Sequence, residues 1–227
     1  MTVQQKIGKR APALTPPHYA TTFGEFIGIG PNGNLWVDGC DVADLAARFG
    51  TPLYIISENQ LRLTYRAFRD AFRAHYPDVE ILFANKSNNG LAIRHIMNSE
   101  GAGGDCFGAQ EMYMALLAGT NPKTLVLNGS NKQTEELEMA IANGLCVNID
   151  AMDELDRIDD IARRLGVVAD IGIRLKLDLE PLTGRMGVSM HGPGTLKQQS
   201  DSTKWGMTRE QTAEIVRRAH AMPSVRL

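Results

Sequence analysis

One lysine stands where β/α proteins place reactive groups. Lys86 follows the apolar run 81–84 and precedes a helical pattern that begins at Leu91. If 79–84 is a parallel strand, Lys86 lies at its carboxyl end, which is the catalytic face of a β/α barrel. A partly desolvated lysine at such a site can lose its proton and form a Schiff base with an aldehyde. By position alone, a solvent-exposed loop lysine is the alternative.

The elements around Lys86 alternate between apolar runs and amphipathic segments. Expected strands are 79–84, 103–107, 124–127, 146–149, 167–177 and 225–227, and expected helices are 91–98, 109–118, 133–142, 152–165 and 208–222. Over the first five of these strands, equivalent positions recur every 21 to 26 residues. Strand–helix–strand units at this spacing are parallel with right-handed crossovers. Their regularity favours a (β/α) TIM barrel over a doubly wound sheet.

The expected organisation has three parts. Residues 1–33 form an irregular lead-in because prolines and glycines interrupt them, and 34–50 hold a strand at 35–37 and a short helix at 41–49. From 51 onward the barrel begins, with a β-prone run at 53–56 and a helix capped by Ser57. Since a complete barrel needs about 250 residues and Leu227 is apolar, we expect the N-terminal part of a longer protein.

Composition excludes several classes. The 227 residues carry 24 Lys+Arg against 26 Asp+Glu, a net charge of −2, which gives no electrostatic footprint for nucleic acid or an anionic membrane. Three separated cysteines suggest neither a disulfide framework nor a metal site. We find no signal peptide or membrane-spanning run and expect a cytoplasmic protein.

The segment Phe83-Ala84-Asn85-Lys86-Ser87-Asn88 resembles the aromatic-Ala-x-Lys-Ala-Asn motif of a known family. These are the pyridoxal-phosphate-dependent decarboxylases with the alanine-racemase-type barrel, which include diaminopimelate, ornithine and arginine decarboxylases. Further segments that look like the family follow in its order, at 50–54, 104–111, 131–144, 150–155, 173–175 and 204–207. The resemblance covers about residue 34 to the end and is closest to diaminopimelate decarboxylase.

The resemblance implies roles for three residues. Lys86 would hold pyridoxal 5'-phosphate covalently and pass it to the substrate amine, so that the cofactor becomes the electron sink when carbon dioxide leaves. Asp105 would tune charge near the lysine and the ring, with a cap of the helix at Ala109 as its alternative. Arg174 would face the cofactor and hydrogen-bond its ring oxygen, or else pair with a carboxylate.

Two departures from the family bear on the substrate. Ser87 replaces the usual alanine, and Phe107-Gly108-Ala109-Gln110 replaces the serine and glycines common in diaminopimelate decarboxylases. The loop at 107–110 is therefore expected to read a different substrate or cofactor edge. The Gly- and Ser-rich stretch 178–202 is expected to form a loop near the active-site mouth.

The implied function is decarboxylation of an amino acid, meso-diaminopimelate to L-lysine in lysine biosynthesis, by a homodimeric enzyme. Alternatives are an ornithine, arginine or carboxynorspermidine-type decarboxylase, a racemase, a barrel homologue that has lost catalysis, and a phosphate-binding barrel with other chemistry. The resemblance puts the C-terminal β-domain, the phosphate-binding glycines, the acid that pairs with the ring nitrogen and the partner-subunit cysteine beyond residue 227. We therefore expect this chain alone to bind pyridoxal phosphate weakly and to be inactive.

Overall fold

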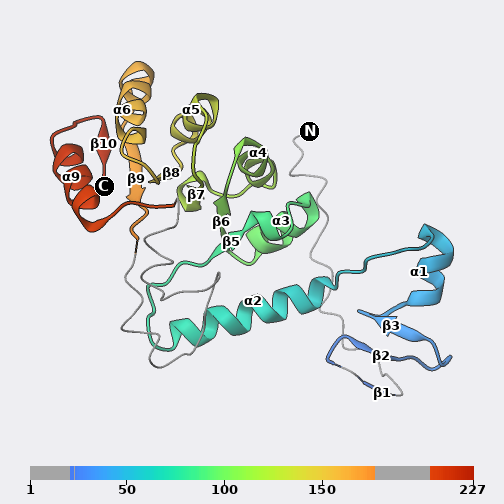
Figure 1. Ribbon diagram of the computed structural model, residues 1–227. Helices are drawn as coiled ribbons and strands as arrows, with labels where there is room; N and C mark the ends of the chain where they lie inside the picture. The colour runs from blue at the N-terminus through green and yellow to red at the C-terminus, as the bar shows by residue number, and fades with distance from the viewer. Residues whose placement is uncertain (1–20, 23, 177–204) are drawn as a thin grey trace, which may run out of the picture. The chain divides into compact units, whose positions relative to one another are not determined.

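The computed structural model describes residues 21–22, 24–176 and 205–227 (Figure 1). Contacts divide the chain into a unit ending at Pro77 and a unit beginning at Asp78, and each is described by itself. The expected loop at 178–202 and most of the lead-in 1–33 lie outside the described residues. Among the described residues, none of the helices has both the length and the apolar character needed to cross a bilayer.

The first unit contains a small antiparallel sheet. Its strands are β1 (Thr21–Thr22), β2 (Ile27–Ile29), β3 (Leu35–Val37) and β4 (Cys40–Asp41), in that order. The strand expected at 35–37 is therefore present, and two further strands lie in the segment expected to be irregular. Asp41 accepts hydrogen bonds from the side-chain amides of Asn32 and Asn34 at 2.6 and 2.8 Å, and its other oxygen caps helix α1 (Val42–Phe49).

Helix α2 (Glu58–Arg73) begins at the predicted cap. Ser57 Oγ accepts a hydrogen bond from the backbone N–H of Gln60 at 3.0 Å. The β-prone run 53–56 before it is not a strand, so that expectation is wrong. β-propensity describes fit to a paired, half-buried surface. This run has no partner strand among the residues that the structure describes, and Tyr54 is 96% exposed.

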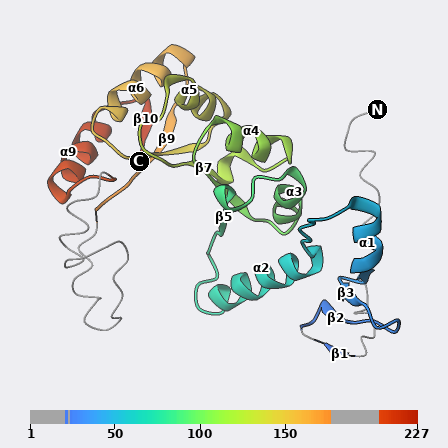
Figure 2. The same ribbon diagram turned by 45° about the vertical axis from the view of Figure 1, so that its right-hand side comes forward.

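The second unit is a six-stranded parallel sheet with helices between its strands. The order is β5 (Leu82–Ala84), β6 (Gly103–Cys106), β7 (Leu125–Leu127), β8 (Cys146–Ile149), β9 (Ala169–Ile173) and β10 (Val225–Arg226). The connecting helices are α3 (Leu91–Ser99), α4 (Ala109–Leu117), α5 (Thr134–Asn143), α6 (Glu154–Leu165) and α9 (Arg209–His220). They follow one another along the sheet in the same order as the strands (Figure 1 and Figure 2).

This strand order distinguishes the two predicted architectures. Each new strand adds to the same edge of the sheet, and all five pairings are parallel. Right-handed crossovers that always move in one direction place their helices on one face, as in a barrel. In a doubly wound sheet the direction in which successive strands are added reverses once, and the strand order of this sheet shows no such reversal. The partial (β/α) barrel prediction is confirmed.

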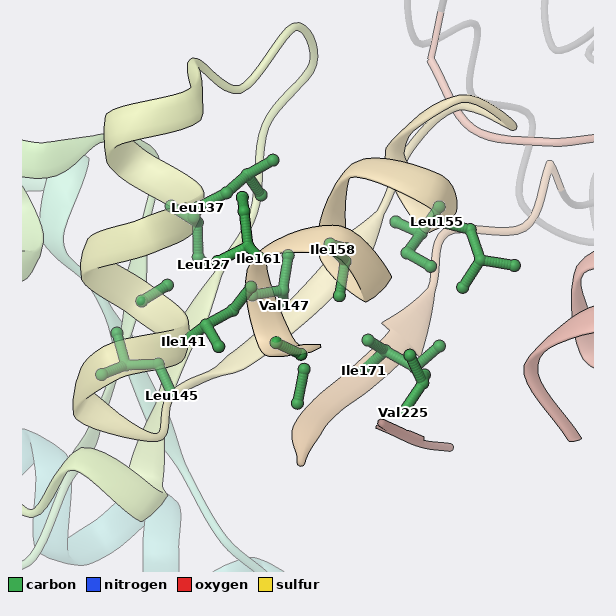
Figure 3. Packing of buried hydrophobic residues seen from close by; sticks show 14 of the residues in the cluster. Leu127, Leu137, Ile141, Leu145, Val147, Leu155, Ile158, Ile161, Ile171 and Val225 are labelled. Atoms are coloured by element: carbon green, nitrogen blue, oxygen red, sulfur yellow. The ribbon is translucent and has the colours of Figure 1, made fainter. Parts of the chain in front are cut away.

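Apolar side chains fill the layer between this sheet and its helices (Figure 3). Leu127 and Val147 reach it from neighbouring strands, and Leu137 and Ile141 reach it from one face of α5, where residues four apart lie above one another. Ile158 on α6 belongs to the same buried layer. The core therefore occupies one face of the strands and leaves the other face for polar groups.

We predict that Leu137→Ala lowers the free energy of unfolding by about 2–5 kcal/mol, because it removes a fully buried side chain and leaves a cavity. The matched control is Leu117→Ala on α4, where the side chain is 56% exposed and the loss should stay within about 0.5 kcal/mol. Denaturant unfolding measures both. Equal losses in the two variants would contradict the assignment of the core.

Candidate active site

The predicted lysine lies on a short turn at the carboxyl end of β5. Strand β5 leads into the 3-10 turn η2 (Asn85–Ser87), which is closed by a hydrogen bond from Asn88 N to Asn85 O of 3.1 Å. Ser87 Oγ donates to Ala84 O at 2.7 Å. Lys86 is exposed, and its Nζ lies 4.5 Å from the centre of the Phe107 ring, which follows β6.

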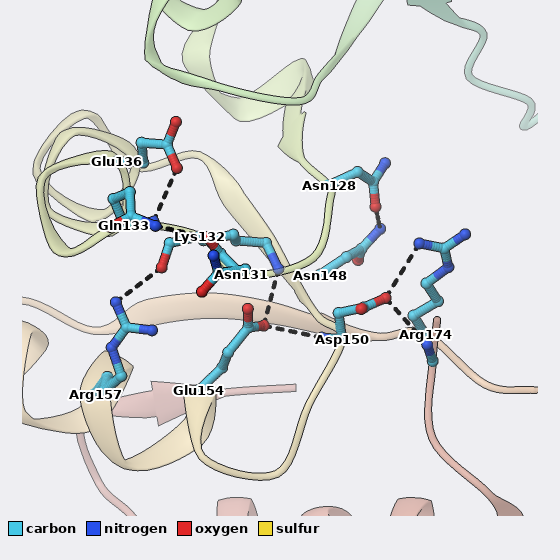
Figure 4. A network of polar contacts seen from close by, with 11 residues as sticks. Asn128, Asn131, Lys132, Gln133, Glu136, Asn148, Asp150, Glu154, Arg157 and Arg174 are labelled. Carbon is cyan, nitrogen blue, oxygen red and sulfur yellow. Dashed lines mark hydrogen bonds and ion pairs between the residues drawn. The ribbon is translucent and has the colours of Figure 1, made fainter. Parts of the chain in front are cut away.

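Asp105 begins a chain of polar side chains across three neighbouring strands. Its Oδ1 accepts a hydrogen bond of 2.5 Å from Asn128 Nδ2. Asn128 Oδ1 in turn accepts one of 2.6 Å from Asn148 Nδ2 (Figure 4). The alternative role of Asp105 as a helix cap is not observed: Ala109 N donates to Glu136 instead. The two amides thus hold the carboxylate in one orientation.

A glycine makes room for this chain. Gly172 on β9 pairs with Asn148 on β8, and a Cβ on Gly172 would lie 2.0 Å from Asn148 Oδ1. No side chain fits at that distance. The missing side chain therefore lets the Asn148 amide occupy the surface of the sheet.

Arg174 follows β9 and has a carboxylate partner. Its guanidinium lies 3.1 Å from Asp150 Oδ1 and 5.5 Å from the centre of the Trp205 ring. The same Asp150 oxygen accepts the backbone N–H of Gly206 at 3.1 Å. The carboxylate pairing foreseen for Arg174 is therefore present, and Arg174 still lines a pocket.

A buried ion pair fixes the position of Asp150. Lys132 Nζ lies 2.8 Å from Glu154 Oε2, both side chains are 2% exposed, and the same oxygen accepts Asp150 N at 2.9 Å (Figure 4). Breaking such a pair on one side leaves an uncompensated buried charge, which costs about 3–5 kcal/mol. The segment that presents Asp150 to Arg174 is consequently rigid.

A pocket of about 420 Å³ lies at the carboxyl ends of the strands, and Asn128, Asn148 and Arg174 are among its lining residues. Phe107, Ile173 and Leu175 form its apolar part. Asn128, Asn148 and Arg174 form its polar part. Lys86 is not among the lining residues, but its Nζ contacts Phe107, which is. An apolar pocket with a few converging polar groups fits a small organic ligand.

Sequence reasoning placed Lys86, Asp105 and Arg174 at this end of the sheet but missed Asn128, Asn148 and Asp150. A signal for the missed residues was available. Strand residues alternate between faces, so Asn128 and Asn148, which neighbour the core residues Leu127 and Val147, must face away from the helices.

Comparison with known proteins agrees with this geometry. A family model described as "Pyridoxal-dependent decarboxylase, pyridoxal binding domain" matches residues 59–227. The chain is 34% identical over 158 residues to the diaminopimelate decarboxylase of Methanothermobacter thermautotrophicus, covering 70% of this chain and 35% of that protein. It is 30% identical over 195 residues to that of Vibrio cholerae, covering 86% of this chain and 44% of that protein.

The crystal structure of diaminopimelate decarboxylase from M. jannaschii superposes with a TM-score of 0.79 and 29% identity, over 88% of this chain and 46% of that one. The chain thus spans less than half the length of these relatives. With the family match over most of its length and the lysine at the carboxyl end of the first strand of its parallel sheet, the chain belongs to the pyridoxal-dependent decarboxylase family through its pyridoxal-binding domain.

Proposed function

We propose that this chain forms the lysine-bearing part of a pyridoxal-phosphate-dependent decarboxylase that converts meso-diaminopimelate to L-lysine. The observation that carries the proposal is the Lys86 amine on a fixed turn at the carboxyl end of β5, next to a pocket. Relatives at 30–35% identity bear the name diaminopimelate decarboxylase. One related structure, from M. jannaschii, is described as a complex with L-lysine.

The residues present fit the cofactor that the family name implies. A planar heterocycle needs an apolar surface for its ring and polar groups at its edge, and the pocket offers Phe107, Ile173 and Leu175 for the first and Asn128, Asn148 and Arg174 for the second. When bound, pyridoxal phosphate supplies an electron sink that stabilises the carbanion left by departing carbon dioxide.

The roles of the chain's own residues follow from their surroundings. Lys86 would hold the cofactor through its side-chain amine. Asp105 places a negative charge at the carboxyl end of β6, oriented by Asn128. Arg174 would offer guanidinium N–H donors to an oxygen of the cofactor ring, and Asp150 holds this guanidinium through an ion pair. The homodimer implied by the family resemblance stays a prediction.

We predict that the chain mixed with pyridoxal phosphate shows the absorbance band of a lysine-bound cofactor and that Lys86→Ala abolishes it. The control is Lys123→Ala. Lys123 is an exposed lysine that precedes β7, and its Nζ lies 3.2 Å from Asp170 Oδ2. This substitution should leave the absorbance band unchanged. Loss of the band in both variants, or in neither, would overturn the assignment of Lys86.

The substrate is tested by carbon dioxide release from the complete gene product with bound cofactor. We expect release from meso-diaminopimelate and none above background from ornithine or arginine. Release from only one of the other amino acids would assign the protein a different substrate within the same family, as the unusual segment at Phe107 would allow. The 227-residue chain by itself is expected to show no turnover.

We predict that Asp150→Asn raises the dissociation constant for pyridoxal phosphate about tenfold. The substitution keeps the side-chain shape and an oxygen for Gly206 N, but it removes the charge that holds Arg174, and hydrogen bonds to charged groups are worth about 1.5–3 kcal/mol. The control is Asp170→Asn, which removes a carboxylate that pairs with Lys123 and Arg226. A spectroscopic titration measures both. Similar affinities for the two variants would refute the role of Asp150.

A further inference from the structure

An arginine is buried behind the turn that carries Lys86. Arg94, on α3, has no solvent exposure. Its guanidinium donates to Asn85 Oδ1 and Gly103 O, both at 3.2 Å, and to Thr120 Oγ1 at 2.8 Å. These acceptors are all uncharged. Within the described part of the chain, Arg94 makes no ion pair with a carboxylate, and its Nε has no hydrogen-bond partner.

Such an arrangement does not serve stability. An isolated charge moved from water into a protein interior carries a large desolvation cost, and this burial lowers the pKa of the Arg94 guanidinium. The Phe83 ring, 5.8 Å from Arg94 Cζ, offsets only part of that cost. An apolar side chain of similar length would fill the same space between helix and sheet without it. Burial of the guanidinium is therefore costly, and its hydrogen bonds to the turn, to β6 and to Thr120 offset part of that cost.

Those hydrogen bonds lead to the residue before Lys86. Asn85 is fully buried, accepts from Arg94 through Oδ1 and donates through Nδ2 to Cys106 Sγ at 3.1 Å. Burial raises the pKa of the Cys106 thiol to about 12, so the sulfur stays protonated and acts as a weak acceptor. Asn85 thus joins the turn of Lys86 to the strand that carries Asp105.

The sheet leaves space for this junction. A Cβ on Gly104 would lie 3.4 Å from Asn85 Nδ2 and 2.7 Å from Leu125 Cδ2, and Arg94 Cζ would be 3.6 Å away. The glycine's bare backbone therefore lets the amide and the guanidinium lie close to β6. Helix, turn and strand meet at this one buried point.

We propose that Arg94 is a positioning residue for Lys86: its buried guanidinium fixes the Asn85 amide, and Asn85 fixes the turn from which the Lys86 amine reaches the cofactor. The inference rests on the proposed function. Arg94 does not touch the cofactor; it acts through Asn85 on where the Lys86 backbone lies.

The test is a double-mutant cycle on the intact chain with Arg94→Met, Asn85→Ala and the two combined. Binding of pyridoxal phosphate is titrated, and the adduct at Lys86 is trapped with borohydride and located by peptide mass. We expect each single variant to raise the dissociation constant at least tenfold, and the double variant to be no more than about twofold worse than the weaker-binding single variant, because one hydrogen-bonded path carries both effects.

Leu137→Ala is the control for lost stability, since it lies in the core away from the turn. We expect it to leave the dissociation constant within twofold of the wild type. The proposal is overturned if Arg94→Met binds as the wild type does, if Leu137→Ala weakens binding equally, or if the effects of the two single variants multiply in the double variant.

A second measurement needs no cofactor. Hydrogen exchange of backbone amides at residues 85–88 in the free chain reports opening of the turn. We expect Arg94→Met to raise this exchange rate at least tenfold. We expect Leu137→Ala to change the rate only as far as it changes the free energy of global unfolding. If Arg94→Met does not fold, Arg94→Lys keeps the charge but loses the guanidinium fork, and exchange at the turn should still rise. An unchanged turn in the foldable variant refutes the positioning role. A wild type that never traps pyridoxal phosphate at Lys86 would refute the proposed function instead.

Discussion

The alternation of side chains along parallel strands is the constraint on which this molecule depends. On β6, Cys106 enters the core while Asp105 faces the other way, and on β8 the core residue Val147 precedes Asn148. A slip of one residue would exchange the two sets. Core burial therefore fixes which residues reach the pocket, because the same backbone register serves both. A shift in strand register that moved the site residues would also expose the core, so the sheet would unfold.

A second layer of buried polar groups stands behind the half-exposed site groups. The exposed Lys86 follows the buried Asn85, and the half-buried Arg174 pairs with the buried Asp150. The buried member fixes the backbone or the guanidinium, and the more exposed member lies at the pocket or beside it. Such groups are costly to bury unless their hydrogen bonds are made. These buried polar groups lie directly behind the site residues, so the hydrogen bonds that offset their burial also fix the geometry of the pocket.

Much of the second unit could be predicted from sequence because its period is set by physical lengths. From β5 to β9, a short strand, a helix and two tight connections occupy about the same number of residues each time, and Lys86 marks a strand end within that period. The strand prediction for 53–56 was wrong because propensity cannot show whether a partner strand exists.

The burial of Arg94 could not be predicted for a similar reason: an arginine on a helix resembles a surface residue until the strand and turn behind it are placed. Asn148 lies inside the expected strand 146–149 and Asn128 directly follows the expected strand 124–127, but the sequence alone does not show that their amides lie side by side.

Interaction free energies differ between the backbone turn that carries Lys86 and the amine at the end of its side chain. The contact of its ammonium with the exposed Phe107 ring is worth about 0.5–1 kcal/mol, which biases the side chain toward the pocket only a few fold. An unsatisfied buried donor or acceptor at Asn85 costs about 1–3 kcal/mol, and Arg94 adds a buried charge to that. The backbone of the turn is therefore held firmly while the amine at the end of the side chain remains mobile. The cofactor role proposed for Lys86 fits this division, because a firmly held turn keeps the reach of the amine centred on one place.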